Sequence, residues 1–297
     1  MENISYTLPA DSLLALTASA MAAILDDPRE ARLESIAARY GMSERDARKG
    51  FIDCAGISPK RFAQFAAAQA GMESLADGES ALEASFEAGG TSAGFLHAVT
   101  CSAEAMSPGE ISSGGEGLAL TDGLFQTLLG MAYAARGPRG IIQLEFLDDE
   151  SEQGIEDAQA RTKARFPKAL VRRDDTSFGD IQKALSPHAP PTRISLMVSG
   201  TNFQMKTWIA ALGVKPGSTA SYADLAREAG SPKAFRATGS AMAANKIALL
   251  IPCHRALRSG GEIGAYKWSS WRKRAILALE AAGRGIDVAQ PEADSLD

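Results

Sequence analysis

The apolar positions divide this chain into a helical first third, a middle part that contains strands, and a helical last third. Before residue 107 the chain is rich in Ala and Leu, with apolar residues at helical spacing and few β-branched residues. Residues 123–147 contain two apolar runs separated by the turn sequence RGPRG, which predicts two strands. A helix over 152–165, a short strand around Leu170 and a helix from Ser177 follow, so the middle part is expected to form a small α/β layer.

Two Pro-, Gly- and Ser-rich segments set the expected boundaries within the chain. Residues 107–117 are expected to form a flexible linker, and residues 186–192 a stiffer connection within one unit. After the second segment the pattern is helical again, with a loop-rich stretch from Ile251 to Tyr266. The predicted fold class is therefore α+β, with an all-α domain at 1–112, a small α/β part at 118–190, a helical part at 193–284 and a disordered tail at 285–297.

The stretch beginning at Ser221 predicts two helices joined by a tight turn. Ser221 is a good N-cap, and Asp224 three residues later completes a capping box. Gly230 is expected to end this helix, with Ser231 capping the next helix and Pro232 in its first turn. This order is typical of a helix-turn-helix, although an ordinary helical hairpin would use the same capping residues.

The charge distribution favours a polyanionic partner for the last third of the chain. The net charge is −5, yet residues 1–115 contain 16 acidic and 8 basic residues, whereas residues 191–284 contain 4 acidic and 14 basic residues. Because salt screens charges over about 8–10 Å, the local balance decides what each part attracts. Lys233 and Arg236, on the expected second helix among Ala, Gly and Ser, suit a partner such as nucleic acid.

Composition excludes several other classes of protein. No apolar run approaches the ~20 residues of a membrane span, and the first residues lack a basic region followed by an apolar one. We therefore expect a cytoplasmic protein with reduced cysteines. Three cysteines without a CxxC pair argue against a disulfide framework and a cysteine-rich zinc site, so no metal or other cofactor is expected.

The clearest chemical candidate is the segment IPCHR, in which a thiol stands beside an imidazole at the end of an apolar run. A cysteine attacks as its thiolate, and a free thiol with a pKa of about 8.5 is mostly protonated at neutral pH. His254 is a base adjacent to Cys253, and Glu280 is a candidate to orient its imidazole. From these residues alone, a buried structural cysteine is an open alternative.

The sequence around this segment resembles the O6-alkylguanine-DNA alkyltransferases. AMAANKIALL precedes IPCHR and GGEIGAYKW follows it, while GTNFQMKTWIAALGVKPGSTASYADLA is similar to the entry of the family's catalytic domain and RKRAILALE to its closing helix. The resemblance covers about residues 118–283 and is strongest from Gly200 onward. It implies an RNase H-like fold for the small α/β part and a winged-helix-like fold for the catalytic part.

The resemblance implies a role for each matching catalytic residue. Cys253 matches the methyl acceptor, His254 the imidazole that activates it through a water, and Glu280 the carboxylate that completes this relay. Asn245 matches the asparagine that ties the turn before the active site to the helix-turn-helix. The implied reaction transfers a methyl group irreversibly from O6-methylguanine, or from O4-methylthymine, to Cys253 after the nucleotide is flipped out of the duplex.

The same resemblance implies which residues contact DNA. Arg236 would fill the base stack that the damaged nucleotide leaves, because an inserted side chain offsets part of the cost of extrusion. Tyr222 would crowd the phosphate on the 3′ side, and Tyr266 would line the guanine pocket. Lys233 and Arg255 complete the expected DNA-binding set. The expected partner is double-stranded DNA containing O6-alkylguanine, bound by a monomer and without any membrane.

Residues 33–111 resemble an AraC-type DNA-binding domain with two helix-turn-helix units. LESIAARYGMSERDARKGFIDCAGISPKRF fits the first unit. The basic residues on or just after its expected recognition helix are Arg45, Arg48, Lys49, Lys60 and Arg61. The expected second recognition helix, TSAGFLHAVTC, lies within residues 62–135, which contain nine acidic residues and no Lys or Arg. This second unit should bind DNA poorly, and packing on the catalytic part or binding another protein is the alternative.

The order of these parts is similar to that of an Ada-type alkylation-response protein without its zinc-bearing domain, whose four cysteines are not found here. Phosphotriester repair is therefore not expected. The predicted function is DNA repair by a single-turnover methylated-DNA–protein-cysteine methyltransferase. The alternative is a transcriptional regulator that uses methylation of Cys253 as its signal. A cysteine hydrolase is disfavoured, because no oxyanion loop is recognisable.

Overall fold

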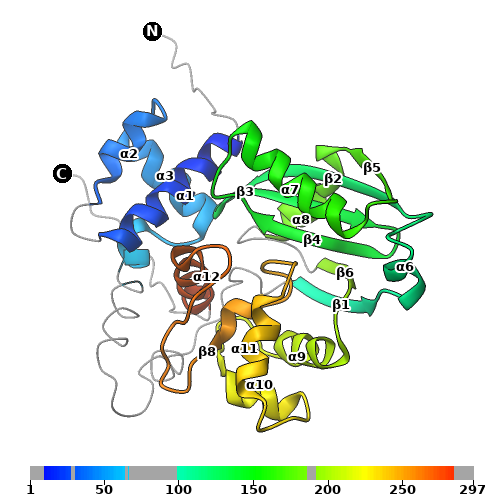
Figure 1. Ribbon diagram of the computed structural model, residues 1–297. Coiled ribbons are helices and arrows are strands. Elements are labelled where there is room, and N and C mark those ends of the chain that lie inside the picture. The colour runs from blue at the N-terminus through cyan, green and yellow to red at the C-terminus, as the bar shows by residue number, and fades with distance from the viewer. Residues whose placement is uncertain (1–9, 28–30, 64–65, 67–98, 186–191, 284–297) are drawn as a thin grey trace, which may run out of the picture.

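The computed structural model describes residues 10–27, 31–63, 66, 99–185 and 192–283, and its centre is a six-stranded mixed sheet (Figure 1). The strands are β1 (Val99–Ala105), β2 (Ala119–Thr127), β3 (Gly130–Gly137), β4 (Gly140–Phe146), β5 (Leu170–Arg173) and β6 (Thr192–Val198), in the order β1-β6-β4-β3-β2-β5. Strands β2, β3 and β4 pair antiparallel, whereas β5 lies parallel to β2 and β1 parallel to β6. The fold is therefore mixed α/β.

Alternating side chains on β3 contribute to an apolar core on each face of this sheet. Ala132 and Ala134 belong to one cluster, and Tyr133 and Ala135 to the other, as the two-residue period of a strand requires. The first cluster includes α8 (Gly179–Ala184) and helices from both ends of the chain. The second is covered by α7 (Glu152–Arg165).

The helices outside the sheet form two groups. The group after β6 consists of α9 (Asn202–Leu212), α10 (Tyr222–Glu228), α11 (Phe235–Ala243) and α12 (Ser270–Gly283). The group before β1 consists of α1 (Ala10–Asp26), α2 (Leu33–Arg39) and α3 (Glu44–Ala55). Trp208 of α9 is buried and donates its indole N–H to the carbonyl of Ala241 in α11 at 2.9 Å, which fixes α11 against α9. No helix within the described ranges has the length and apolar character needed to cross a membrane.

The first helical group packs directly on the sheet and on α12. Helix α1 contacts α12 and the strands β2 and β3, and Arg274 of α12 donates a hydrogen bond to the carbonyl of Leu25 at 3.1 Å (Figure 1). The expected turn between α2 and α3 is confirmed: Gly41 has a φ of 66°, and Ser43 caps α3 by accepting from the N–H of Asp46. The helix-turn-helix outline of α2 and α3 thus packs on α1, which in turn contacts α12.

The sheet opens between β4 and β6, and the segment before Cys253 lies in this opening. Strands β4 and β6 pair only at Ile141 and Leu196. Farther along β4, the N–H of Leu144 donates to the carbonyl of Lys246 at 3.0 Å, and the N–H of Ala248 donates back to Leu144 at 2.7 Å. The backbone that leads to the thiol is therefore fixed to a central strand.

Two expectations about the end of the first helical part are wrong. Val99–Ala105, expected to be helical within the second recognition unit, is strand β1 and pairs along its whole length with β6. Residues 107–117, expected to be a flexible linker, contain α6 (Pro108–Ser112), which begins with a capping box between Ser107 and Glu110. Glu110 also forms an ion pair with Arg139 at 2.7 Å. Long-range pairing with β6 overrides the local composition at β1, whereas α6 is ordered by its local capping box and by the ion pair with Arg139.

Two strands were also missed from the sequence. The apolar run expected to be one strand before RGPRG is the pair β2 and β3, which turns at Leu128 and Leu129. Strand β6 stands where a helical pattern was expected from residue 193. The turn at RGPRG, the helix over 152–165 and the strand around Leu170 are confirmed. Residues 91–98, 186–191 and 285–297, which carried further expectations, lie outside the described residues.

Candidate active site

Cys253 lies in a buried turn that the chain reaches through a strained backbone. It begins the 3-10 turn η2 (Cys253–Arg255), and its N–H donates to the carbonyl of Ile251 at 2.8 Å. Leu249, four residues earlier, has a φ of 62°, a left-handed conformation that a leucine rarely adopts. Leu249 is buried in the main apolar cluster, so packing holds this strain next to the thiol.

The side-chain amide of Asn245 organises this turn. Its Nδ2 lies 3.0 Å from the carbonyl of Ile247, 3.2 Å from that of Ile251 and 3.2 Å from Sγ of Cys253. Its Oδ1 accepts from the N–H of Ile247 at 2.8 Å. Asn245 is fully buried, so one amide satisfies the polar groups of the loop and points a donor at the sulfur.

A second buried cluster centres on Glu280 of α12. One carboxylate oxygen lies 3.0 Å from Nε2 of His254 and accepts from Nη2 of Arg255 at 2.8 Å. The other accepts from the backbone N–H of Gly217 at 3.1 Å. Glu280 and His254 are fully buried. The carboxylate acceptor places the imidazole proton on Nε2, which leaves Nδ1 as the basic nitrogen.

Burial keeps His254 neutral, and the pairing of Glu280 with Arg255 leaves that effect in control. Burial lowers the pKa of His254, and the nearby carboxylate opposes this shift only in part. Burial also disfavours the charge on Glu280, but Arg255 and His254 hold the pKa of the carboxyl at about 2. The ionised pair of Glu280 and Arg255 is therefore already neutral overall. Nδ1 of His254 has no hydrogen-bond partner within the described residues, so it can accept a proton directly or through a water.

The thiol itself is held in its protonated form. Burial raises the pKa of Cys253, and the hydrogen bond from Asn245 and the positive charge of Lys273 act against that shift. Lys273 is fully buried, donates to the carbonyl of Ala256 at 2.7 Å and has its own pKa lowered to about 8 by burial. The free protein thus has a thiol that becomes a nucleophile only when a base takes its proton.

Two tyrosines named from the sequence lie near the thiol. Tyr266 is buried, packs edge-to-face on Trp268 with ring centroids 5.3 Å apart, and has its pKa raised well above the usual value by burial and by Cys253. Tyr222, the first residue of α10, is half-buried, and its pKa is raised by burial and by the same cysteine. The fold therefore joins the helix-turn-helix to the cysteine turn.

Arg255 does not lie where the sequence-based assignment placed it. It was expected to contact DNA, but it is only 6% exposed. Its guanidinium is held by Glu280 and by the carbonyl of Val214, to which Nη1 donates at 2.5 Å. Arg255 is therefore a correction: it is the internal counter-ion of Glu280. The motif alone could not reveal this, since the carboxylate comes 25 residues later.

The helix-turn-helix outline is confirmed at its first helix and corrected at its second. Ser221 and Asp224 form the expected capping box of α10. The second helix, α11, begins at Phe235 rather than beside Ser231, so Lys233 lies in the preceding turn. Lys233 and Arg236 are both exposed, and neither forms an ion pair within the described part of the chain.

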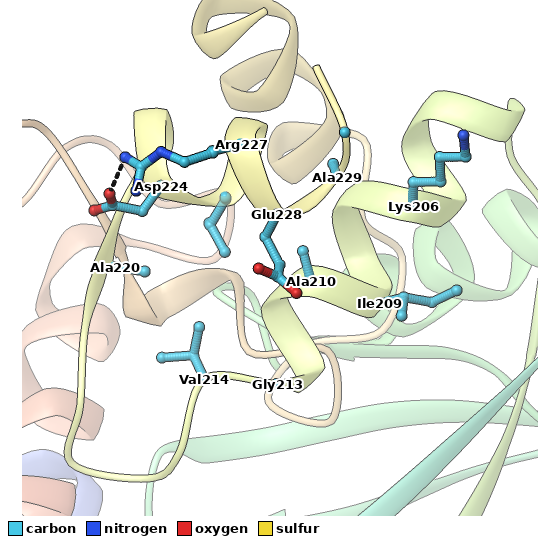
Figure 2. A pocket seen from close by; sticks show the side chains of 12 residues that line it. Lys206, Ile209, Ala210, Gly213, Val214, Ala220, Asp224, Arg227, Glu228 and Ala229 are labelled. Atoms are coloured by element: carbon cyan, nitrogen blue, oxygen red, sulfur yellow. Dashed lines mark hydrogen bonds and ion pairs between the residues drawn. The ribbon is translucent and has the colours of Figure 1, made fainter. Parts of the chain in front are cut away.

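A cavity of about 760 Å³ between α9 and α10 does not include the thiol. Ile209, Val214 and the exposed ion pair of Asp224 and Arg227 line it (Figure 2). Cys253 is absent from its lining. The chemistry of the site therefore belongs to the buried clusters around Asn245 and Glu280.

The chain is similar to known DNA alkyltransferases. Residues 202–282 match the family model of the 6-O-methylguanine DNA methyltransferase, DNA binding domain. The chain is 32% identical over 262 residues to the bifunctional transcriptional activator/DNA repair enzyme Ada of Escherichia coli, covering 87% of this chain and 73% of that protein. It is 46% identical over 83 residues to a methylated-DNA–protein-cysteine methyltransferase of Kluyveromyces lactis, covering 28% and 44% of the two chains. The crystal structure of Mycobacterium tuberculosis OGT in complex with DNA matches with 26% identity, 55% and 94% coverage and a TM-score of 0.45.

Replacing Asn245 should destabilise the protein strongly. Asn245→Ala leaves the buried N–H of Ile247 without its partner, and an unsatisfied buried N–H costs about 1–3 kcal/mol. The carbonyls of Ile247 and Ile251 each lose one of two donors and keep a backbone N–H. We expect the free energy of unfolding, measured by urea denaturation, to fall by about 2–4 kcal/mol. The exposed Asn202→Ala is the control and should change it by less than about 0.5 kcal/mol. Equal effects of the two variants would contradict the role given to Asn245.

Removing the charge of Arg255 should leave a larger fraction of His254 already protonated at neutral pH and unable to accept the thiol proton. In Arg255→Gln the carboxylate of Glu280 loses its counter-ion, so the pKa of His254 rises. The methyl-transfer rate should fall at neutral pH and recover toward alkaline pH, so the midpoint of the rate–pH profile moves upward.

Arg255→Lys keeps the charge and is the matched control for this profile. The single variant Arg255→Gln leaves a buried carboxylate without its counter-ion, which can destabilise the fold. The double variant Arg255→Gln/Glu280→Gln removes both charges and should restore the stability lost for that reason. A profile of Arg255→Gln with an unchanged midpoint would show that Arg255 does not set the protonation of His254.

Proposed function

This chain belongs to the methylated-DNA–protein-cysteine methyltransferase family, with Ada-like relatives, and we propose from that premise that Cys253 is its methyl acceptor. The chain repairs DNA by methyl transfer. The observation that carries the assignment of Cys253 is its position between two buried clusters. Asn245 points a donor at the sulfur, and the neighbouring His254 is neutral and oriented by Glu280.

The proposed reaction moves one methyl group and one proton. The thiol proton of Cys253 passes to Nδ1 of His254, directly or through a water, and Lys273 and Asn245 stabilise the thiolate that remains. The sulfur attacks the methyl carbon, and a C–S bond forms as the bond to guanine O6 breaks. The leaving guanine takes up a proton, and His254 returns the thiol proton through water, so that one proton moves in total. The product is an unreactive thioether, so each molecule reacts once. The same chemistry extends to O4-methylthymine.

Access to the methyl group requires the nucleotide to leave the duplex, at a cost of a few kcal/mol. We assign Arg236, exposed on α11, to the base stack that the nucleotide vacates, and Lys233 to a neighbouring phosphate. Tyr222 lies near Cys253 and is assigned to the strand beside the flipped nucleotide, while Tyr266 lines the guanine pocket. Double-stranded DNA containing O6-alkylguanine is the proposed partner, bound by a monomer in the cytoplasm.

The finer description of the domains belongs to the same proposal. We assign the sheet to an RNase H-like part and α9 to α12 to a winged-helix-like catalytic part. We assign α2 and α3 to the first unit of an AraC-like domain, with no zinc-bearing domain among the described residues. Since β1 joins the sheet, the AraC-like part ends before Val99 rather than at residue 112.

An Ada-like regulator of transcription is the second candidate function. The observation that favours it is the turn between α2 and α3, which places Arg45 and Lys49 on one exposed face of α3. Arg48 on the same helix is paired with Glu44 at 2.6 Å and is less available to a phosphate. The close packing of α1 on α12 gives this unit a physical connection to the repair site.

Mass spectrometry tests the assignment of Cys253. After incubation with a duplex that contains one O6-methylguanine, the tryptic peptide of residues 247–255 should gain the mass of one CH₂ group, with a limiting stoichiometry of one per protein molecule. Cys253→Ser should abolish the gain, and the peptides containing Cys54 and Cys101 should stay unmodified. A methyl group found on another residue, or a gain that survives Cys253→Ser, would overturn the proposal.

DNA binding by the full chain tests the second candidate. If α3 contacts phosphates, Arg45→Ala/Lys49→Ala should weaken binding to undamaged duplex, and the slope of log affinity against log salt should fall by about one for each lost contact. Methyl transfer to Cys253 should be unaffected, because α3 packs on α1 and α2 and, among the described residues, contributes no hydrogen bond to the clusters around the thiol. Lys163→Ala, an exposed cation on α7, is the control. Affinity and salt slope equal to those of the control would exclude DNA contact by α3.

A further inference from the structure

Phe235 stands out on the surface of the helix-turn-helix. It is the first residue of α11 and is 48% exposed. Among the large apolar side chains exposed in the described part of the chain, it is the only aromatic one. Phe235 lies outside the buried apolar clusters of the described residues, so it does not pack into the core. It stands at the start of the helix that we assign to DNA binding.

The immediate neighbour of this ring is the arginine assigned to the base stack. The guanidinium carbon of Arg236 lies 5.8 Å from the ring centroid of Phe235, within the range of a cation–π contact. The two side chains therefore leave the same end of α11 together. One offers an apolar plane, and the other offers a charge with several N–H donors.

The other exposed side chains of α11 are small, so the backbone of another molecule can approach this helix closely. Ala237, Ser240 and Ala243 are the exposed residues that follow along α11. Gly239 lies inside the helix, where glycine costs about 1 kcal/mol relative to alanine, yet a Cβ there would meet nothing within 4 Å. The protein's own packing does not require this glycine, which fits a surface shaped for an external backbone.

We propose that Phe235 is a second wedge, which enters the minor groove beside Arg236 and stacks on the base pair next to the extruded nucleotide. This inference rests on the proposed function, because it takes the DNA-facing role of α11 as given. If α11 approaches the groove as closely as its small residues allow, a ring projecting from its first turn meets the bases rather than the solvent. Apolar wedges of this kind partially unstack a base step and bend the duplex.

The two side chains then have different tasks. The Phe235 ring stacks on the base pair at the step beside the lesion. Arg236 fills the stack that the nucleotide vacates and donates hydrogen bonds to the unpaired base. The contact between them in the free protein holds both in position before DNA arrives.

Single-turnover kinetics on three substrates test this proposal: a duplex with O6-methylguanine, the same strand unpaired, and the free O6-methylguanine base. Phe235→Ala should slow repair of the duplex about tenfold more than it slows reaction with the free base, as loss of one aromatic stacking contact predicts. Phe235→Trp should keep the duplex rate, and Phe235→Leu should fall between. Ile209→Ala, which truncates an equally exposed apolar residue on α9, should leave the duplex rate unchanged.

A 2-aminopurine base next to the lesion reports unstacking of that step directly. Its fluorescence should rise on binding of the unmodified protein and rise much less with Phe235→Ala. Equal slowing on duplex and free base, or an unchanged fluorescence change, would overturn the wedge. If Arg236→Ala slows duplex repair and Phe235→Ala does not, only this inference fails. If the unmodified protein places no methyl group on Cys253, the proposed function fails and the inference with it.

Discussion

A single buried negative charge, the carboxylate of Glu280, is the constraint on which the site depends. An ionised carboxylate without water must be paired, and Arg255 supplies the matching charge at 2.8 Å. The same carboxylate accepts from His254 and from the N–H of Gly217, and Arg255 also donates to Val214. Helix α12, the cysteine turn η2 and the loop before β7 (Ala220–Ser221) are therefore positioned together by one charge.

The reactivity of the thiol follows from this balance. Arg255 neutralises the charge of Glu280, so the carboxylate does not require a protonated His254. Burial then lowers the pKa of His254, and the neutral ring can accept a proton. Burial likewise raises the pKa of Cys253 and keeps the thiol protonated in the free protein, so it is unreactive until a base removes its proton. The segment before Cys253 is hydrogen-bonded to β4, which fixes the cluster around Asn245 to the sheet. Helix α1 packs on α12, which fixes the cluster around Glu280 to the first helical group.

The sequence was sufficient to predict the features that depend on residues close together in the chain. The capping box at Ser221 and Asp224 and the turn at Gly41 follow from local backbone chemistry, so both could be predicted. Strand β1 could not, because its hydrogen bonds come from β6, about 90 residues later, and the local composition favoured a helix. Arg255 was misassigned for the same reason: only the folded chain brings Glu280 to its guanidinium.

The protonation of His254 tests the central claim most directly. Nitrogen NMR of the imidazole in a His97→Gln/His188→Gln background, where His254 is the remaining histidine, follows its titration and tautomer. Burial of the ring beside the compensated pair of Glu280 and Arg255 predicts a neutral ring at pH 7, with the proton on Nε2 and a pKa below the ordinary value of about 6.5. A doubly protonated ring at pH 7, with a pKa raised above that value, would contradict it.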